Sequence, residues 1–229
     1  YANRDEAFWQ AIARHGQIVS LALVFTLAIG LPLGWATHRY AAVGRAMFPV
    51  LNIIQTIPSI ALFGLLMAPL AWLATSWPVL GDAGISGVGL APGVLALTLY
   101  SLLPVVRGTL AGLAQVPSAV TQAALGLGFS QSQLFWQAQV PLALPVVLGG
   151  IRTASIQAVG LAAVTALIGA GGLGSLMFEG LFSSAQDLVL LGVVPIVVLG
   201  ALVDGAFKLL IRLTRPVSTH RELSRRDSP

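Results

Sequence analysis

Residues 117–145, PSAVTQAALGLGFSQSQLFWQAQVPLALP, lie between apolar blocks and form the one long connection whose residues suit neither lipid nor a simple turn. Small residues and leucines alternate with polar residues at helical spacing over residues 118–127. Gly126 and Gly128 then interrupt this run. The pattern predicts a short helix that lies outside the membrane and ends at a glycine turn.

A second short helix is predicted directly after that turn. Ser130 is suited to cap residues 131–139, because its hydroxyl can accept from an orphan backbone N–H. Pro141 is expected to end this helix, because proline lacks the N–H that a helix interior needs. Such a helix pair, held at a membrane face by a span on each side, is suited to dock into a groove of a soluble partner.

Composition excludes an ordinary soluble domain. Hydrophobic residues make up 56% of the 229 residues, charged residues make up 9%, and the mean hydropathy is +0.88. A soluble domain carries about 25% charged residues, so the chain is predicted to be an all-α protein that crosses a membrane several times. The absence of cysteine excludes disulfides, thiolate metal sites and a cysteine nucleophile.

Five apolar blocks are long enough to cross a membrane, since about 20 helical residues span a hydrocarbon core of ~30 Å. We expect a lead-in at 1–16, a membrane domain at 17–212 that contains the connection at 117–141, and a polar tail at 213–229. The expected spans lie near residues 17–37, 47–73, 90–106, 142–169 and 188–210.

The basic residues are distributed unequally between the two membrane sides. If residues 117–141 are cytoplasmic, only Arg4 and Arg14 lie outside. The positive-inside rule then predicts an external N-terminus and a cytoplasmic C-terminus, and it explains the net charge of +4 without nucleic acid. The basic residues on the expected cytoplasmic side are Arg39, Arg45, Arg107, Lys208, Arg212, Arg215, Arg221, Arg225 and Arg226.

Polar residues recur on single faces of the expected spans. One such stripe occupies residues 52–59 at spacings of three and four. These stripes are expected either to line a water-filled path or to join helices by hydrogen bonds. The candidate path residues are Asn52, Gln55, Thr56, Ser59, Thr98, Ser101, Thr153 and Gln157.

Two further features concern how the spans pack together. Arg152 and Asp204 lie about 15 Å and 12 Å from the expected cytoplasmic ends of their spans, so we expect a buried ion pair. The pairs Gly30/Gly34 and Gly108/Gly112 have the spacing of close helix crossings, although chance in a glycine-rich chain explains them equally well.

Searches for nucleotide and metal sites exclude several functions. The sole lysine, Lys208, follows Phe207, so the chain has no G-x-x-x-x-G-K-[ST] phosphate loop and any ATPase must be another chain. Residues 169–174 satisfy G-x-G-x-x-G, but they lie between membrane-length blocks and lack the strand that a dinucleotide fold requires. The histidines, His15, His38 and His220, are scattered at three different segment ends and predict no metal site.

The connection resembles the coupling helix of permease subunits of ATP-binding-cassette (ABC) importers. The resemblance is carried by the spacing of the Gln-Ala-Ala triplet, the glycine and the proline, although Gln122, Ala138 and Val140 stand where the family has Glu, Ile and Leu. In that family the loop docks into a cleft of the ATPase. The resemblance assigns ATPase coupling to Gln122, Ala123, Ala124, Gly126, Gly128 and Pro141.

Further blocks, at residues 52–66, 99–109, 144–154 and 167–174, resemble the permease subunits of osmoprotectant importers for glycine betaine, choline or carnitine. The resemblance covers about residues 17–212. Importers of methionine share the fold and loop, and permeases for ergothioneine are closely similar, so these substrates remain alternatives. A secondary carrier or channel is the alternative of another class.

The resemblance implies a five-span type I importer permease of the methionine-importer kind, in the bacterial inner membrane. It implies a transport subunit rather than an enzyme, with ATP and Mg²⁺ held by separate ATPase subunits and no cofactor in this chain. The implied partners are the ATPases, a second permease that is identical or paralogous, and an external substrate-binding protein.

Overall fold

The computed structural model describes residues 2–82 and 84–214, and every regular element in this part of the chain is helical. The prediction of an all-α protein is therefore confirmed. Five helical segments are long and apolar enough to cross a membrane: Asp5–Arg39, Ser59–Ser76, Leu90–Ala114, Gln131–Ala162 and Gln186–Thr214. The elements are α1 (Ala2–Arg39), α2 (Ala41–Thr56), α3 (Ser59–Ser76), α4 (Pro78–Asp82), α5 (Leu90–Ala114), α6 (Ser118–Gly126), α7 (Gln131–Gln133), the π-helix η1 (Leu134–Gln139), α8 (Val140–Ala162), the 3₁₀ helix η2 (Val164–Ile168), α9 (Leu173–Phe182) and α10 (Gln186–Thr214).

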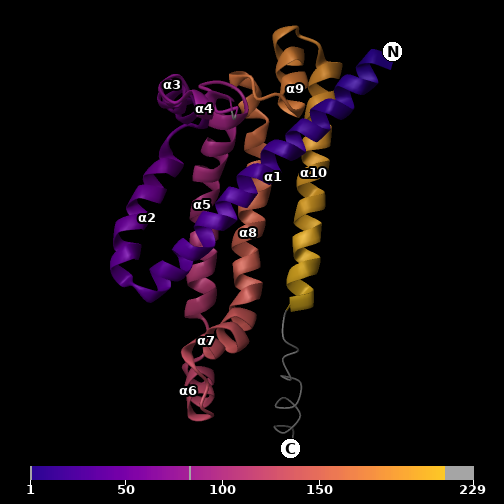
Figure 1. Ribbon diagram of the computed structural model, residues 1–229. Coiled ribbons are helices and arrows are strands. Elements are labelled where there is room, and N and C mark those ends of the chain that lie inside the picture. Colours follow the sequence, from indigo (N-terminus) through magenta and orange to yellow (C-terminus); the bar gives the residue numbers. More distant parts are fainter. Residues whose placement is uncertain (1, 83, 215–229) are drawn as a thin grey trace, which may run out of the picture.

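The chain passes back and forth along the bundle (Figure 1). Helices α1, α5 and α10 run towards the end where α6 and α7 project, and α2 and α8 run back. Helices α3, α4 and α9 lie at the other end. We call these the α6 end and the α9 end. The N-terminus lies at the α9 end, and α10 finishes towards the α6 end, as the predicted topology requires.

Helix α1 is one continuous helix of 38 residues, so the described part of the lead-in, from Ala2, is helical and joins the first span without a break. Its length is about 57 Å at 1.5 Å per residue, well above the ~30 Å of a hydrocarbon core. Figure 1 shows α1 crossing the other long helices diagonally. A tilt of this kind fits an overlong helix into a bilayer.

The second apolar block was predicted as one kinked span over 47–73, and this prediction is wrong in detail. The helix breaks at Ile57, whose ψ of 127° is extended, because Pro58 disfavours helical angles in the residue before it. The freed carbonyl of Ile57 accepts from the hydroxyl of Tyr100 on α5. Gln55 Nε2 also donates to the Tyr100 carbonyl at 2.6 Å, so Tyr100 on α5 holds the last turn of α2 and the break itself. Helix α2 runs along the bundle, and α3 turns away at the α9 end (Figure 1).

Other boundaries also differ from expectation. Helix α5 continues to Ala114, beyond the predicted end at 106, so Arg107 lies inside the helix rather than in a cytoplasmic loop. Helix α8 ends at Ala162 rather than near 169, and η2 follows it. The residues of the polar tail from 215 onward lie outside the described part of the chain.

Both glycine pairs mark close helix crossings. A Cβ placed on Gly34 would lie 2.5 Å from Cβ of Thr109, so α1 approaches α5 closely. A Cβ on Gly108 would lie 2.8 Å from Cα of Gly150, so α5 and α8 also nearly touch. Small residues permit this backbone contact, which drives helix association where lipid removes the hydrophobic force. The alternative of chance spacing is thereby rejected.

Adjacent glycines on α8 test the crossing directly. A Cβ at Gly150 would lie 2.6 Å from the Pro104 carbonyl oxygen, whereas one at Gly149 would meet nothing within 4 Å. We expect Gly150→Ala to destabilise the fold by about 1–3 kcal/mol, because the rigid backbones must separate. Gly149→Ala should be neutral or stabilising by up to about 1 kcal/mol, since alanine favours helices. Thermal unfolding in detergent measures both, and equal melting temperatures would contradict the crossing.

The glycine-rich residues 169–174 connect η2 to α9. Arg14 on α1 donates from Nε to the Ala170 carbonyl at 2.9 Å. A Cβ on Gly174 would lie in the carbonyl group of Ala163, so close helix packing excludes a side chain there. No strand precedes this loop in the described chain. The pattern that mimics a dinucleotide motif is therefore explained by positive φ angles at Gly169 and Gly171 and by close packing at Gly174.

Candidate coupling and translocation sites

The turn after α6 is a complete Schellman motif. The N–H of Gly128 donates to the Leu125 carbonyl, and the N–H of Phe129 donates to the Ala124 carbonyl, each at 3.0 Å. Gly128 has φ +85°, a left-handed conformation that costs a residue with a Cβ about 1–2 kcal/mol. A Cβ there would meet no atom of this chain within 4 Å. The backbone angle, rather than crowding, explains the glycine.

Ser130 caps the next helix, as predicted. Its hydroxyl accepts from the Gln133 N–H at 3.3 Å, and the Gln133 side chain accepts from the Ser130 N–H at 2.8 Å, which completes a capping box. Pro141 does not end this helix, so that prediction is wrong. The helix widens into η1 and continues as α8, with the Val140 N–H bonded to the Phe135 carbonyl five residues back. The wide turn of η1 comes just before Pro141, which provides no N–H for the helical ladder.

Most predicted coupling residues are solvent-accessible at the tip of the structure. Gln122, Ala123, Gly126, Gly128 and Pro141 are exposed, and Ala124 is buried. Apolar side chains that the sequence analysis did not assign lie among them: Leu125, Leu127 and Trp136. Leu127 is 80% exposed, although it lies outside the apolar blocks and gains nothing from lipid. In the sequence, its position between Gly126 and Gly128 was the feature that could have indicated a residue in contact with a partner.

An aromatic cluster connects this tip to the first helix. The rings of Trp35 on α1 and Phe135 in η1 meet edge to face, with centroids 6.4 Å apart. Phe135 and Trp136 also pack edge to face at 5.0 Å. A movement of α6 and η1 would therefore be transmitted to α1 through the contact between Phe135 and Trp35.

Charges are sorted between the two ends of the bundle. Arg39 closes α1 and Arg45 opens α2 at the α6 end, and Lys208 and Arg212 lie in the last turns of α10. Acidic residues lie near the α9 end: Asp5 and Glu6 at the start of α1, Asp82 on α4, Glu179 on α9 and Asp187 at the start of α10. By the positive-inside rule this distribution supports a cytoplasmic α6 end.

The structure separates the eight candidate path residues into three groups. The first group surrounds the α2–α3 break, where Gln55 bonds to α5 and Asn52 and Thr56 are exposed. The Asn52 side chain accepts from Arg107 Nη2 at 2.8 Å. Ser59 begins α3 and is partly buried. Asn52 and Thr56 therefore lie on the surface of the described chain.

The second and third groups lie elsewhere. Thr98 and Ser101 are buried inside the bundle, and the Thr98 hydroxyl donates to its own helix at the Val94 carbonyl. The Thr26 hydroxyl lies 3.5 Å from the Thr98 carbonyl, a contact that joins α1 to α5. Thr153 is exposed and Gln157 is partly buried on α8. For Thr98 the position fits the alternative of hydrogen bonding within the bundle.

Arg152 and Asp204 lie in contact, and a third residue joins them. Arg152 Nε donates to Asp204 Oδ1 at 2.5 Å. Lys208 Nζ lies 2.7 Å from Asp204 Oδ2, one helical turn further along α10. The group is half-buried rather than buried, since the side chains of Arg152 and Asp204 are 33% and 23% exposed. Two cations therefore share one carboxylate, and the i, i+4 spacing of Asp204 and Lys208 was the signal that the sequence offered.

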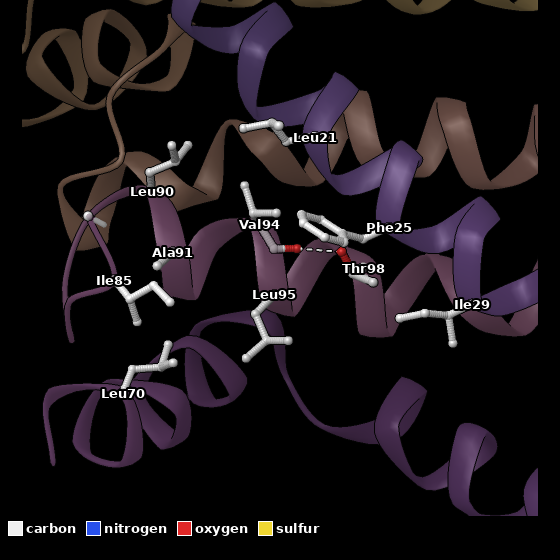
Figure 2. A pocket seen from close by; sticks show the side chains of 11 residues that line it. Leu21, Phe25, Ile29, Leu70, Ile85, Leu90, Ala91, Val94, Leu95 and Thr98 are labelled. Carbon is white, nitrogen blue, oxygen red and sulfur yellow. Dashed lines mark hydrogen bonds between the residues drawn. The ribbon is translucent and has the colours of Figure 1, made fainter. Parts of the chain in front are cut away.

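A cavity of about 410 Å³ lies between α1, α3 and α5 near the α9 end. Figure 2 shows that its lining is almost wholly hydrocarbon, with Leu21, Phe25 and Ile29 projecting from α1. The hydroxyl of Thr98 is already bonded to the Val94 carbonyl. A quaternary ammonium prefers several aromatic faces, and Phe25 is the single aromatic in this lining. The cavity is therefore unsuited to such a cation.

Metal binding finds no support in residues 2–82 and 84–214, where no three His, Cys, Asp or Glu residues lie close enough to share an ion. His15 is fully buried, and its Nε2 lies 3.1 Å from the Val159 carbonyl. It therefore joins α1 to α8. His220 lies outside the described residues.

The fold is that of a type I ABC importer permease. A chain of the inward-facing MetNI methionine ABC transporter superposes with a TM-score of 0.78, at 20% identity, over 92% of this chain and 97% of that chain. An amino acid ABC transporter solved with histidines gives a TM-score of 0.66 at 17% identity, over 93% of this chain and 94% of that chain. At these identities the likeness shows the fold.

Sequence comparison gives the family. Residues 26–216 match the family described as "Binding-protein-dependent transport system inner membrane component", and the chain belongs to it. It is a multi-pass inner-membrane protein and a transport permease subunit rather than an enzyme.

Curated relatives share most of the chain. The osmoprotectant import permease protein OsmW of Salmonella typhimurium is 38% identical over 83% of this chain and 84% of its own length. The glycine betaine/carnitine/choline transport system permease protein OpuCD of Bacillus subtilis is 30% identical over 95% of this chain and 88% of its own length. The carnitine transport permease protein OpuCD of Listeria monocytogenes is 32% identical over 95% and 89%, respectively.

Proposed function

We propose that this chain is the permease subunit of an ATP-driven importer for a small osmoprotectant such as glycine betaine, choline or carnitine. The observation that carries the proposal is the exposed helix pair α6–α7, with its Schellman turn and capping box, in a chain of the importer permease family. Two permease subunits form the pore, and the substrate passes between them. The second subunit is identical or paralogous.

Energy comes from separate ATPase subunits that bind ATP and Mg²⁺. The exposed surface of α6 and the turn, with Gln122, Ala123 and Leu127, docks into a cleft of the ATPase. Closure of the ATPase dimer moves this surface. The motion passes along the continuous helix from α7 through α8, and across the cluster of Trp35, Phe135 and Trp136 to α1. The pore then switches between outward and inward access.

An external binding protein selects the substrate. The relatives named for osmoprotectant, glycine betaine, carnitine and choline transport support this substrate class. The aromatic cage that a quaternary ammonium requires belongs on the binding protein, because the apolar cavity of this chain is unsuited to the cation. The binding protein docks at the α9 end, where Phe182 is 79% exposed and hollows run along α9.

Reconstitution tests this proposal. Proteoliposomes that contain the chain, its ATPases and its binding protein should accumulate labelled glycine betaine only with ATP and with the binding protein. Omission of either component should reduce uptake to the background of empty liposomes. Uptake by the chain alone, driven by a proton or sodium gradient, would contradict the proposal and favour a secondary carrier. Methionine or ergothioneine uptake in the same assay would revise the substrate class and leave the coupling intact.

A further inference from the structure

Arg107 is an exposed cation inside a membrane-length helix. It lies on α5, seven residues before the helix ends at Ala114, and its Nη2 donates to Oδ1 of Asn52 at 2.8 Å. Among the described residues, no carboxylate lies within ion-pair distance of Arg107. Helices α2, α3 and α5 contain no Asp or Glu. This face therefore carries a positive charge that no described residue neutralises.

The Arg107 side chain does not extend towards the lipid headgroups at the α6 end. The bond between Gln55 and the Tyr100 carbonyl sets a common level on the antiparallel helices α2 and α5. From this level, Asn52 is three residues, or about 4.5 Å, and Arg107 is seven residues, or about 10 Å, towards the α6 end. The Arg107 side chain therefore reaches towards the middle of the membrane to meet Asn52. A snorkelling arginine would extend the other way.

The polar residues beside Arg107 form one face of α2. Asn52 and Thr56 lie four residues apart on α2, and both are exposed. The other side of α2 is apolar, with Leu51 buried in a cluster against α5. Exposed polar groups at membrane depth normally face a bundle interior or water rather than lipid. This face is therefore better suited to water than to lipid.

We propose that the face of α2 with Arg107 lines the pore and makes it electropositive, so that the transporter favours substrates with a carboxylate over purely cationic ones. This inference rests on the proposed function and narrows its substrate class. Glycine betaine and carnitine carry a carboxylate beside their quaternary ammonium, whereas choline does not. A fixed cation in a narrow path attracts the carboxylate and repels a ligand whose only charge is positive.

Thiol labelling tests the proposal without any transport measurement, because the chain has no cysteine. Thr56→Cys is a suitable reporter, since the Thr56 hydroxyl donates only within its own helix in the described structure, to the Ile53 carbonyl. Val197→Cys is the matched control, because Val197 is 64% exposed on an apolar stretch of α10. The probes are sulfonatoethyl methanethiosulfonate, an anion, and trimethylammonioethyl methanethiosulfonate, a cation. Each rate in the assembled transporter is divided by the rate with free 2-mercaptoethanol.

We expect both probes to label Thr56→Cys faster than Val197→Cys, with a normalised preference for the anion. Arg107→Gln should reduce the ratio of anion to cation rates by about fivefold, and Arg107→Lys should retain it. If Arg107→Gln fails to assemble, the ratios measured with native Arg107 and with the Arg107→Lys variant still decide the question. Labelling of Thr56→Cys no faster than the control, or a ratio at or below one, would overturn the proposal.

Substrate uptake provides a second test of the proposal. With binding protein loaded to saturation by each substrate, Arg107→Gln should shift ATP-driven uptake towards choline relative to glycine betaine, by about fivefold. An unchanged preference in a variant with normal expression would overturn the inference and leave the proposed function standing. If the wild-type transporter shows no ATP-driven uptake, the proposed function fails, and the labelling ratio still decides whether the face is aqueous and electropositive.

Discussion

Gly128→Val is expected to uncouple the ATPase while the membrane bundle stays folded. Valine at φ +85° costs at least about 1–2 kcal/mol, so the Schellman turn should open rather than bear this strain. Opening displaces Leu127 and the start of α7 from the docking surface. We expect ATPase affinity to fall about tenfold or more, which corresponds to at least about 1.4 kcal/mol. The measurement is ATPase binding to the purified variant in nanodiscs.

Two further variants separate the possible reasons for a glycine. Gly128→Asn keeps a left-handed turn accessible, because asparagine tolerates this conformation. Retained binding in Gly128→Asn assigns the effect to the backbone, and lost binding assigns it to close contact with the ATPase. Gly126→Ala changes a residue inside helix α6, where a Cβ would meet no atom within 4 Å, so it should preserve the turn. Normal binding and normal substrate-stimulated hydrolysis in Gly128→Val, at normal expression, would contradict the assigned role.

Asp204→Ala should reduce folded yield more than any other single change in the group of Arg152, Asp204 and Lys208. It leaves Arg152 on α8 and Lys208 on α10 without their shared carboxylate. An uncompensated charge inside a membrane span is costly. Arg152→Gln should be milder, because Lys208 still pairs with Asp204. The double variant Arg152→Gln/Asp204→Asn should recover much of the loss, since one exposed lysine remains near the end of α10.

Monodisperse yield from size-exclusion chromatography, with Leu202→Ala on the exposed side of α10 as the control, measures this order. A yield for Asp204→Ala equal to that of Arg152→Gln would show that the carboxylate does not hold the two cations in the membrane. The sequence analysis predicted a pair of Arg152 and Asp204 alone, because Lys208 was assigned to the cytoplasmic side. One helical turn between Asp204 and Lys208 changes this expectation.

The sequence was sufficient for features that depend on local chemistry. Five membrane-length apolar helices, the helix-glycine-helix connection and the Ser130 cap all follow from residue spacing, and the structure contains each of them, although the second apolar block is broken at Ile57. A left-handed glycine and a capping box satisfy backbone groups within a few residues. They are therefore visible before any tertiary contact is known.

Features that depend on distant partners were missed. Pro58 was visible, but the full break at Ile57 is stabilised by Tyr100, which lies 43 residues away. Pro141 was expected to end a helix, and no residue pattern near it predicted the wide π-helical turn of η1 that precedes it. Arg107 was assigned to a loop because a charge usually ends an apolar run, whereas it lies within α5, where Asn52 from α2 accepts its hydrogen bond. For Ile57 and Arg107, a residue from another helix decided the outcome.

Photo-crosslinking tests the central claim most directly, namely that the α6–α7 tip docks onto an ATPase. Leu127→Cys and Phe182→Cys, modified with benzophenone maleimide, place the same probe on side chains that are 80% and 79% exposed at opposite ends of the bundle. In membranes that contain the whole transporter, Leu127→Cys should form an adduct with the ATPase, and Phe182→Cys should form none with it. An ATPase adduct from Phe182→Cys, or none from Leu127→Cys in a transporter that still hydrolyses ATP, would contradict the account.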